Sequence, residues 1–226
     1  LRPKDTPLGG PLETLYPGET VMEFEITPNR ADLASMEGMA REFVALGAKA
    51  KDRAAIRAPT AGPLGGWKVE VVDAKDCPTY SLTALTVKAG IASPDWMRKR
   101  LSASGVRSLG LVVDITNYVL LEIGQPLHAF DIDKIQGTTI RIRRAKDGET
   151  LAGLDGGQHG LTPQDLVIAD GKGPVALAGV VGGKESAVGP GTRNILLEAA
   201  RFQPGTVRKT ARRLALHTES SRRFGR

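Results

Sequence analysis

Residues 114–131, DITNYVLLEIGQPLHAFD, are apolar enough to be buried, yet polar side chains interrupt them throughout. The polar positions are Asp114, Thr116, Asn117, Gln125, His128 and Asp131. Burying a polar group is unfavourable unless it finds a hydrogen-bond partner. Two interpretations follow. Either these side chains hold one another in place, or some of them are kept ready for a ligand.

The pattern TNYVLLEI predicts a buried helix that ends at Gly124, followed by a loop through residues 125–131. Thr116 and Asn117 then fall in the first helical turn, where capping accounts for one such residue but not for both. A single histidine in an apolar loop, as expected for His128, is more often a core residue with a partner than a catalyst. Both roles stay open for His128.

Three regions are expected along the chain. Residues 1–52 predict a small α/β piece, with a strand over 20–26, where apolar and polar residues alternate, and an amphipathic helix ended by Gly47. Residues 53–66 are rich in small residues, Pro and Gly, which indicates a linker. Residues 67–226 then form a larger domain.

Helices and strands are intermixed in this larger domain without regular alternation. A helix is expected over 93–105, with Ser93 as its N-cap, and a basic helix over 204–216. Short strands joined by Gly- and Asp-containing turns are expected at 67–73, 80–90, 138–145, 149–157, 165–183 and 194–202. This order favours the α+β class, with mixed or antiparallel sheets and flanking helices.

The composition is that of a folded globular protein, with 41% hydrophobic and 25% charged residues among 226. No apolar run is long enough to predict a membrane span. Cys77 is the single cysteine, so an internal disulfide and a multi-cysteine zinc site are excluded, and a cytoplasmic location is expected. His128, His159 and His217 lack metal-binding spacing, so no metal site is predicted. The chain lacks an initiator Met, and we expect it to be a fragment.

The net charge of +6 is concentrated near the C-terminus. Nine lysines and arginines and two glutamates occur from Arg193 onwards, giving that part +7 and leaving −1 for the rest. Such a concentration favours contact with phosphates, although a solvated helix face explains it equally well.

Glu198 is an unusual residue for its position. In a strand it shares a face with Leu196 and Ala200, and both faces of that strand are largely apolar. A carboxylate there needs a partner, which is either a nearby arginine such as Arg193 or a hydroxyl or amine of a ligand. The glycines of LAGVVGG, residues 177–183, lack a phosphate-loop pattern. They indicate either a tight strand crossing or backbone that faces a ligand.

Five stretches together resemble the β subunit of bacterial phenylalanine–tRNA ligase. The order and spacing of the stretches hold over nearly all of the chain, which makes the resemblance specific. It extends from the later part of the first structural domain of that subunit through its tRNA-editing domain. The stretches are EITPNRADLASMEGMAREFVAL (25–46), VVDITNYVLLEIGQPLHAFD (112–131), LVIADGKGPVALAGVVGG (166–183), LLEAARFQP (196–204) and RKTARRLALHTESSRRF (208–224).

The resemblance implies that the larger domain hydrolyses tyrosine wrongly attached to tRNA(Phe). A pocket built for phenylalanine cannot strongly reject an added hydroxyl, whereas a site that hydrogen-bonds the hydroxyl selects for it. The resemblance assigns substrate binding to Glu198, Gly182, Thr218 and Ser220. It assigns the ester end to Thr116, Asn117 and His128, without deciding whether His128 is a base or orients water. Charge suggests Arg208, Arg212 and Arg213 as contacts for tRNA.

The resemblance also implies partners and cofactors for the whole enzyme. The partner is the α subunit, in a heterotetramer of two α and two β subunits. The cofactors are ATP and magnesium, and neither is expected to bind this fragment. Two departures from the family pattern stand out: Ser108-Leu109-Gly110-Leu111 replaces Pro-Ile-Asn-Asn, and Gly225 replaces Glu. The alternative function is a non-catalytic tRNA-binding or assembly module that keeps the fold and has lost editing.

Overall fold

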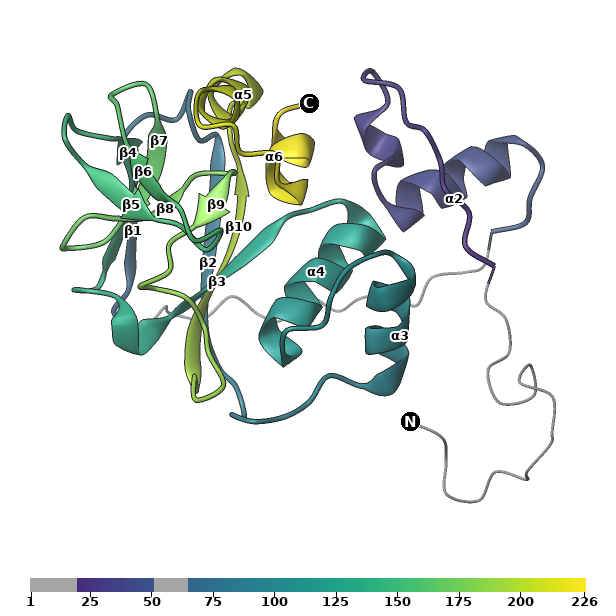
Figure 1. The fold of residues 1–226 in the computed structure, drawn as a ribbon, viewed down its shortest axis with the longest axis horizontal. Coiled ribbons are helices and arrows are strands. Elements are labelled where there is room, and N and C mark those ends of the chain that lie inside the picture. The colour runs from purple at the N-terminus through teal and green to yellow at the C-terminus, as the bar shows by residue number, and fades with distance from the viewer. Residues whose placement is uncertain (1–19, 51–64) are drawn as a thin grey trace.

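The computed structural model describes residues 20–50 and 65–226. Its centre is a pair of sheets, seen side by side in Figure 1. The three-stranded sheet is antiparallel and has the order β2 (Thr79–Thr86), β10 (Asn194–Arg201), β3 (Leu127–Asp131). The five-stranded sheet has the order β1 (Lys68–Val71), β4 (Thr139–Arg144), β7 (Leu166–Ala169), β8 (Pro174–Leu177), β9 (Val181–Gly182). Only its β1–β4 pair is parallel.

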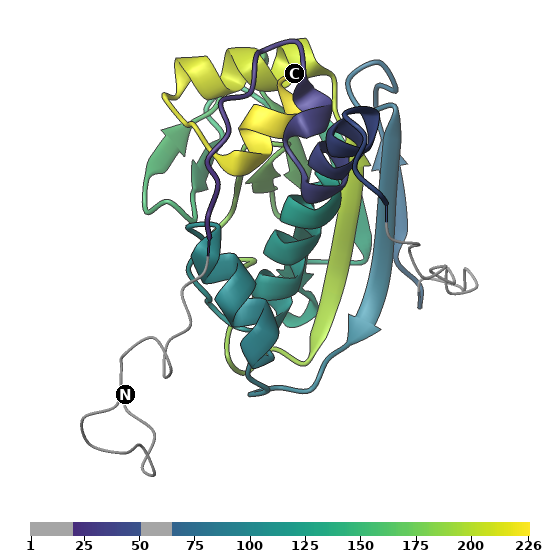
Figure 2. The ribbon, with the colours of Figure 1, turned by 90° about the vertical axis from the view of Figure 1, so that its right-hand side faces the viewer.

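Helices cover the face of the three-stranded sheet that points away from the five-stranded sheet. Figure 2 shows α3 and α4 in front of β2 and β10. A small hairpin of β5 and β6 extends the other side of the molecule. The remaining elements are η1 (Ala31–Leu33), α2 (Met36–Ala45), α3 (Asp95–Ala103), α4 (Leu111–Ile123), η2 (Ile132–Lys134), β5 (Thr150–Ala152), β6 (Gln158–Gly160), α5 (Pro204–Arg213) and α6 (Glu219–Phe224). The predicted α+β class is confirmed.

The main core lies between the two sheets. Phe130 and Leu196 come from the three-stranded sheet, and Ile140, Ile168 and Leu177 come from the five-stranded one; all are almost fully buried. Each such side chain contributes about 1.5–3 kcal/mol through removal from water. Alternate residues of β10, among them Leu196 and Ala200, therefore face the five-stranded sheet, as the two-residue period of a strand predicts.

The predicted strand over residues 20–26 is wrong. These residues form neither a helix nor a strand, and Val21 and Met22 are 64% and 66% exposed. Alternation produces a strand only where a neighbouring strand supplies hydrogen bonds, and no described strand lies alongside. Phe24 instead packs edge-on against Phe43, with 6.0 Å between ring centroids. In its described part the N-terminal piece is therefore helical rather than α/β. Residues 1–19 and 51–64 lie outside the described residues, and with them most of the predicted linker over 53–66.

Two boundaries around α4 also differ from expectation. The helix ends at Gly124, whose φ of 79° is left-handed, as predicted. It begins at Leu111, more than a turn earlier than expected, so Thr116 and Asn117 are not in its first turn. The predicted loop over 125–131 is wrong as well, because Leu127–Asp131 pairs with β10. Pairing with a buried strand satisfies backbone groups that a loop would leave open.

The N-cap predicted for α3 is displaced by one residue. Pro94 occupies the cap position, while the Ser93 hydroxyl donates to the carboxylate of Asp114. At the other end, the positive φ of Gly105 fits the predicted stop. The Ser93 hydroxyl therefore bonds Asp114 of α4 instead of capping α3, and this bond connects α3 to α4.

The N-terminal helix docks on this frame. Ser35 caps α2 by accepting a hydrogen bond from the Gly38 N–H (3.0 Å), and α2 packs against α4. The guanidinium of Arg223 in α6 donates to the carbonyl of Ala34 (3.2 Å). Elements far apart in the sequence therefore meet at this corner of the molecule.

Candidate functional site

Most polar groups of residues 114–131 have partners within the protein. Asp114 is fully buried and accepts hydrogen bonds from the hydroxyls of Ser93 and Ser108 and from the Leu109 N–H (2.8 Å). Burial acts to raise the pKa of Asp114, but the bonds from Ser108 and Ser93 outweigh it, and the pKa lies below its usual value. The Gln125 amide donates to two backbone carbonyls. The Ser108–Leu111 departure thus supplies partners for Asp114.

Among the enclosed polar atoms of this segment, Nε2 of His128 is the exception. Thr116 donates to the carbonyl of Val113 (2.8 Å), and Asp131 accepts from the hydroxyl of Thr192 (2.6 Å). The Nε2 atom of His128, by contrast, is enclosed and has no hydrogen-bond partner among the described residues. The segment therefore contains polar groups that are bonded within the protein and one, on His128, that is open to a ligand.

His128 and Glu198 lie directly opposite each other on β3 and β10. Directly opposed residues of antiparallel strands have their Cβ atoms about 4.5–5.5 Å apart. Both side chains line a cavity of about 60 Å³ between the two sheets, together with Gly182 and Ser220. One water needs only about 10–15 Å³ of such space, so the cavity has room for several water-sized groups.

Glu198 is buried, with 5% of its surface exposed, and has no hydrogen bond or ion pair to any described residue. The alternative in which Arg193 pairs with it is wrong. Burial raises the pKa of Glu198 to about 8, because a carboxylate loses its hydration in apolar surroundings. The carboxyl group is therefore mostly protonated at pH 7 and can both donate and accept a hydrogen bond.

His128 is neutral in the same setting. The residue as a whole is half-buried, but its Nε2 atom is shut off from water, and its ring packs edge-on against Phe130 with 4.5 Å between centroids. Burial lowers the pKa of His128 to about 4. No ion pair joins it to Glu198. The cavity thus holds a neutral acid opposite a neutral imidazole.

Gly182 permits the close approach of His128 to β9. A Cβ atom at this position would lie 2.4 Å from Cε1 of His128 and 2.9 Å from Cδ1 of Leu154. The Gly182 carbonyl accepts a hydrogen bond from the Leu154 N–H (2.9 Å). The glycine cluster therefore marks backbone that other groups approach closely, at a wall of the cavity.

Of the two predicted α6 residues, Ser220 lines the cavity and Thr218 does not. Thr218 caps α6 by accepting from the Ser221 N–H (3.0 Å) and donates to the carbonyl of Val180 (2.8 Å). Because Val180 belongs to the cavity wall, Thr218 holds α6 against that wall.

The structure does not bring Thr116 and Asn117 to this cavity. Both lie on α4, which packs on the opposite side of the three-stranded sheet from the five-stranded sheet (Figures 1 and 2). Neither lines the space between the sheets. Thr116 and Asn117 are close to His128 in sequence but not in space, because the chain passes from the helical layer into the three-stranded sheet after Gly124.

The three arginines predicted to contact tRNA differ in their surroundings. Arg213 makes an ion pair with the buried carboxylate of Asp165 and donates to the carbonyl of Gly160 (3.3 Å). Arg208 donates to the carbonyl of Gly225. Arg212 is exposed on the last turn of α5. Of the three, Arg212 is the one whose side chain no described hydrogen bond or ion pair holds.

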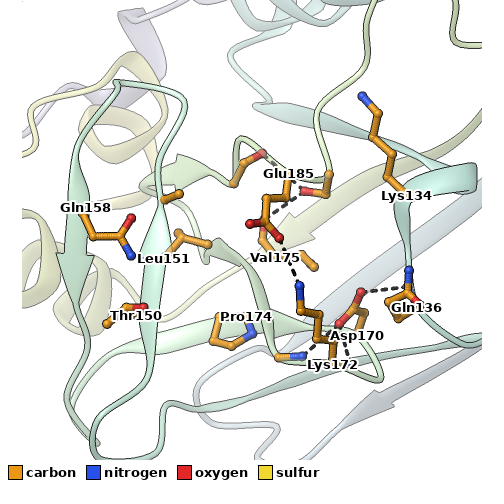
Figure 3. Close-up of a pocket in the computed structure, with 14 residues that line it drawn as sticks. Lys134, Gln136, Thr150, Leu151, Gln158, Asp170, Lys172, Pro174, Val175 and Glu185 are labelled. Carbon is orange, nitrogen blue, oxygen red and sulfur yellow. Dashed lines mark hydrogen bonds and ion pairs between the residues drawn. The ribbon is translucent and has the colours of Figure 1, made fainter.

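A larger cavity, of about 530 Å³, lies elsewhere and contains none of the predicted site residues (Figure 3). Its charged groups have partners within the protein. Lys172 lies 3.5 Å from Glu185, and Asp170 accepts from the backbone N–H groups of Gln136 and Lys172 (2.8 Å each). Groups already paired have less to offer a ligand than the unpaired Glu198 and His128.

Residues 20–50 and 65–226 show neither a candidate metal site nor a membrane-spanning helix. This part of the chain holds no group of three or more His, Cys, Asp or Glu side chains placed to bind a metal ion. None of its helices combines the length and the apolar character needed to cross a bilayer.

Tyr80 is a polar residue near the site that the sequence pattern did not single out. Its hydroxyl is enclosed and lacks a hydrogen-bond partner among the described residues. Burial, and secondarily the charge of Glu198, raise the pKa of Tyr80 well above its usual value. The pairing of β2 with β10 places Tyr80 on the same face of the sheet as Glu198, two residues along β2 from the residue opposite it.

Known proteins resemble this chain in sequence. The family model described as the B3/4 domain matches residues 76–226, and the chain belongs to that family. Over 99% of its length the chain is 47% identical to the phenylalanine–tRNA ligase β subunit of Geobacter sulfurreducens. It is 46% identical, over 97% of its length, to that of Gloeobacter violaceus. The predicted resemblance to this β subunit is confirmed.

The chain spans only 28% of the length of these relatives. A solved N-terminal fragment of the phenylalanyl-tRNA synthetase β subunit from Pyrococcus horikoshii superposes with a TM-score of 0.44 at 18% identity, covering 83% of this chain and 58% of that one.

Proposed function

We propose that this chain is an editing domain that hydrolyses the ester between tyrosine and tRNA(Phe). The observation that carries the proposal is the carboxyl group of Glu198, buried without a partner in a cavity shared with His128. The similarity to phenylalanine–tRNA ligase β subunits supports tRNA(Phe) as the carrier of the ester.

Glu198 would select the phenol. A protonated carboxyl group offers one donor and one acceptor, and a phenol hydroxyl offers the complementary pair. Phenylalanine would leave the buried carboxyl group unpaired, at a cost of about 1–3 kcal/mol. That difference corresponds to roughly 5- to 150-fold in favour of tyrosine.

The hydrolysis itself needs little from the protein, because an aminoacyl ester is already activated. Water attacks the ester carbonyl carbon, the bond from that carbon to the ribose oxygen breaks, and the ribose oxygen leaves with a proton. With its pKa lowered to about 4, His128 is a weak base, so we assign it the orientation of water through a ring nitrogen. A terminal hydroxyl of the tRNA completes the proton transfer in this scheme. Thr116 and Asn117 do not enter it.

The partners of the longer protein belong to the same proposal. By its resemblance, the chain would act in the cytoplasm within a β subunit that assembles with α subunits as a heterotetramer. ATP and magnesium would serve the attachment of phenylalanine at a site on the other subunit. The editing step proposed for this chain uses its own side chains, water and a hydroxyl of the tRNA.

A deacylation assay tests the proposal. Wild type, Glu198→Gln and Glu198→Ala are each given tyrosyl-tRNA(Phe) and phenylalanyl-tRNA(Phe), with Glu185→Gln as a surface control. Wild type and the control should release tyrosine faster by the ratio above. Glu198→Ala should lose the preference, whereas Glu198→Gln, whose neutral amide also donates and accepts, should keep part of it. Equal rates on both substrates by wild type would remove the proposed role of Glu198. No hydrolysis by folded wild type would favour the non-catalytic tRNA-binding or assembly module.

A further inference from the structure

The outer helical layer carries a surface of aromatic and basic side chains that the proposed function does not use. This α3–α4 surface consists of Trp96, Lys99 and Arg100 of α3, Arg107 of the segment that follows α3, and Tyr118 of α4. Both helices lie on the side of the three-stranded sheet that faces away from the cavity (Figures 1 and 2). A role for this surface is therefore separable from the proposed editing.

The α3–α4 surface is strongly basic compared with the sequence around it. Residues 95–107 contain four lysines and arginines and one aspartate, a net charge of +3, whereas residues 1–192 as a whole carry −1. The aspartate pairs with Arg98. Lys99 and Arg107 are exposed and make no hydrogen bond or ion pair to a described residue. Their charges are therefore left for an anionic partner.

Neutral groups hold Arg100, the third cation of this surface. Its guanidinium donates to the hydroxyl of Tyr118 (2.6 Å) and lies 5.3 Å from the centre of the Trp96 ring. The rings of Trp96 and Tyr118 also meet at 87°, with 5.3 Å between their centroids. These contacts give the side chains a fixed direction and leave the positive charge uncancelled. An anion would therefore meet a guanidinium that is already ordered, which lowers the entropy cost of binding.

Trp96 is more exposed than the packing of α3 requires. Met97 and Leu101 anchor the helix in the interior and are 7% and 0% exposed, whereas Trp96 is 50% exposed. Aromatic side chains among cations are typical of single-strand nucleic-acid binding, because a base stacks on the ring while the cations bind phosphates. Protein interfaces, by contrast, are depleted in lysine. Lys99 beside an open indole therefore favours a nucleic acid over a protein partner.

We propose that the α3–α4 surface binds single-stranded RNA, with a base packed on the open surface of Trp96 and phosphates bound by Lys99, Arg100 and Arg107. The strand is single because a base must be unpaired and unstacked to pack on a side chain. The inference does not rest on the proposed function, since it requires no ester and no ligand in the cavity.

Fluorescence of Trp96 tests the contact directly. The chain has two tryptophans, so Trp67→Phe leaves Trp96 as the single reporter. A short oligouridylate, which does not pair with itself, is titrated into this protein. We expect it to quench the fluorescence, and we expect inorganic tripolyphosphate, which has the charge but no base, not to do so.

Affinities from the anisotropy of a labelled oligouridylate test the individual side chains. Trp96→Ala should weaken binding about 5- to 150-fold, the loss of one stacked base. Lys99→Ala and Arg107→Ala should each reduce the slope of log binding constant against log salt concentration by about 0.7, because each removes one phosphate contact. Lys172→Ala, at an exposed lysine beside the larger cavity (Figure 3), is the matched control and should change neither quantity. Melting temperatures establish that each variant is folded.

Two outcomes would overturn the inference. Oligouridylate that leaves Trp96 fluorescence unchanged, and binds folded Trp96→Ala, Lys99→Ala and Arg107→Ala as it binds wild type, would place RNA binding elsewhere on the molecule. Quenching by a phenylalanine–tRNA ligase α subunit, but not by oligouridylate, would make this surface a protein interface. Either outcome leaves the proposed editing function standing, because the deacylation assay decides that function separately.

Discussion

Glu198→Gln is expected to remove a pH dependence of stability that the wild-type chain carries. In the folded protein burial raises the pKa of Glu198 to about 8, against 4.5 for an ordinary glutamate. Between these two values the folded state keeps a proton that the unfolded state has released. The free energy of unfolding therefore falls as pH rises, by about 1.4 kcal/mol per pH unit.

Over the interval from pH 4.5 to pH 8, Glu198 lowers the free energy of unfolding by about 5 kcal/mol in total. About 3 kcal/mol of this decrease has occurred by pH 7. His128 works in the opposite direction. Its pKa falls from 6.5 to about 4 on folding, so its share of the stability is present above pH 6.5 and is lost as pH falls towards 4. The two effects cancel between pH 4.5 and 6.5. Wild type should lose about 2 kcal/mol between pH 6.5 and 8.

Urea unfolding at several pH values between 5 and 8.5 measures this profile. The glutamine variant keeps only the His128 effect, so its stability should rise to pH 6.5 and then level off. Other titrating groups are common to both proteins and cancel in the difference. The Cys77 thiol, whose pKa burial raises to about 11, and Tyr80 ionise above this range. Glu185→Gln, at the surface, should follow wild type.

The result that would refute the reasoning is a constant stability difference between Glu198→Gln and wild type from pH 5 to pH 8. A carboxyl group that is already ionised at pH 5 would give that result. It would show that Glu198 is not a neutral, buried acid, and phenol selection by such an acid would fail with it.

Two further predictions concern packing and charge. Gly182→Ala adds a Cβ atom 2.4 Å from the neighbouring imidazole, which should cost about 1–3 kcal/mol of stability and slow deacylation of tyrosyl-tRNA; wild-type values for both would contradict the close approach. A matched Gly189→Ala, which meets open space, should change neither. Arg213→Ala should lower the free energy of unfolding by about 1–3 kcal/mol, because buried Asp165 loses a charged partner. Arg212→Ala should leave the free energy of unfolding unchanged and reduce the slope of log binding constant for tRNA against log salt concentration by about 1. A reduced slope in Arg213→Ala and not in Arg212→Ala would show that Arg213 is the phosphate contact.

Local patterns in the sequence predicted what depends on a single element. Alternation put Glu198 on a buried face of its strand, and the helical period put Val207 and Ala211 on the inner face of α5. Gly124 ended its helix because a glycine adopts a positive φ without strain. Such features follow from the direction of each side chain relative to its own backbone, which residues close in sequence set.

Features that depend on contact with a second helix, strand or loop were either mispredicted or not predictable from the sequence. The alternating residues 20–26 form no strand, and the apolar segment that holds His128 forms one, because a strand exists only where another strand pairs with it. The basic sequence around Arg213 predicted a phosphate contact, yet Arg213 makes an ion pair with the buried Asp165, which lies far away in the sequence. Charge in the sequence does not say which partner the fold supplies.

By itself, the sequence indicated that Glu198 would be buried in an apolar strand and that polar side chains would interrupt the buried segment 114–131. Only the tertiary structure decided that His128 lies opposite Glu198, that Tyr80 lies on the same sheet face, and that Asn117 belongs to another layer. The physical reason is register. A shift of one residue in the pairing of β3 with β10 would turn His128 to the other face of the sheet, and burial of the alternate residues between two sheets is what fixes that register.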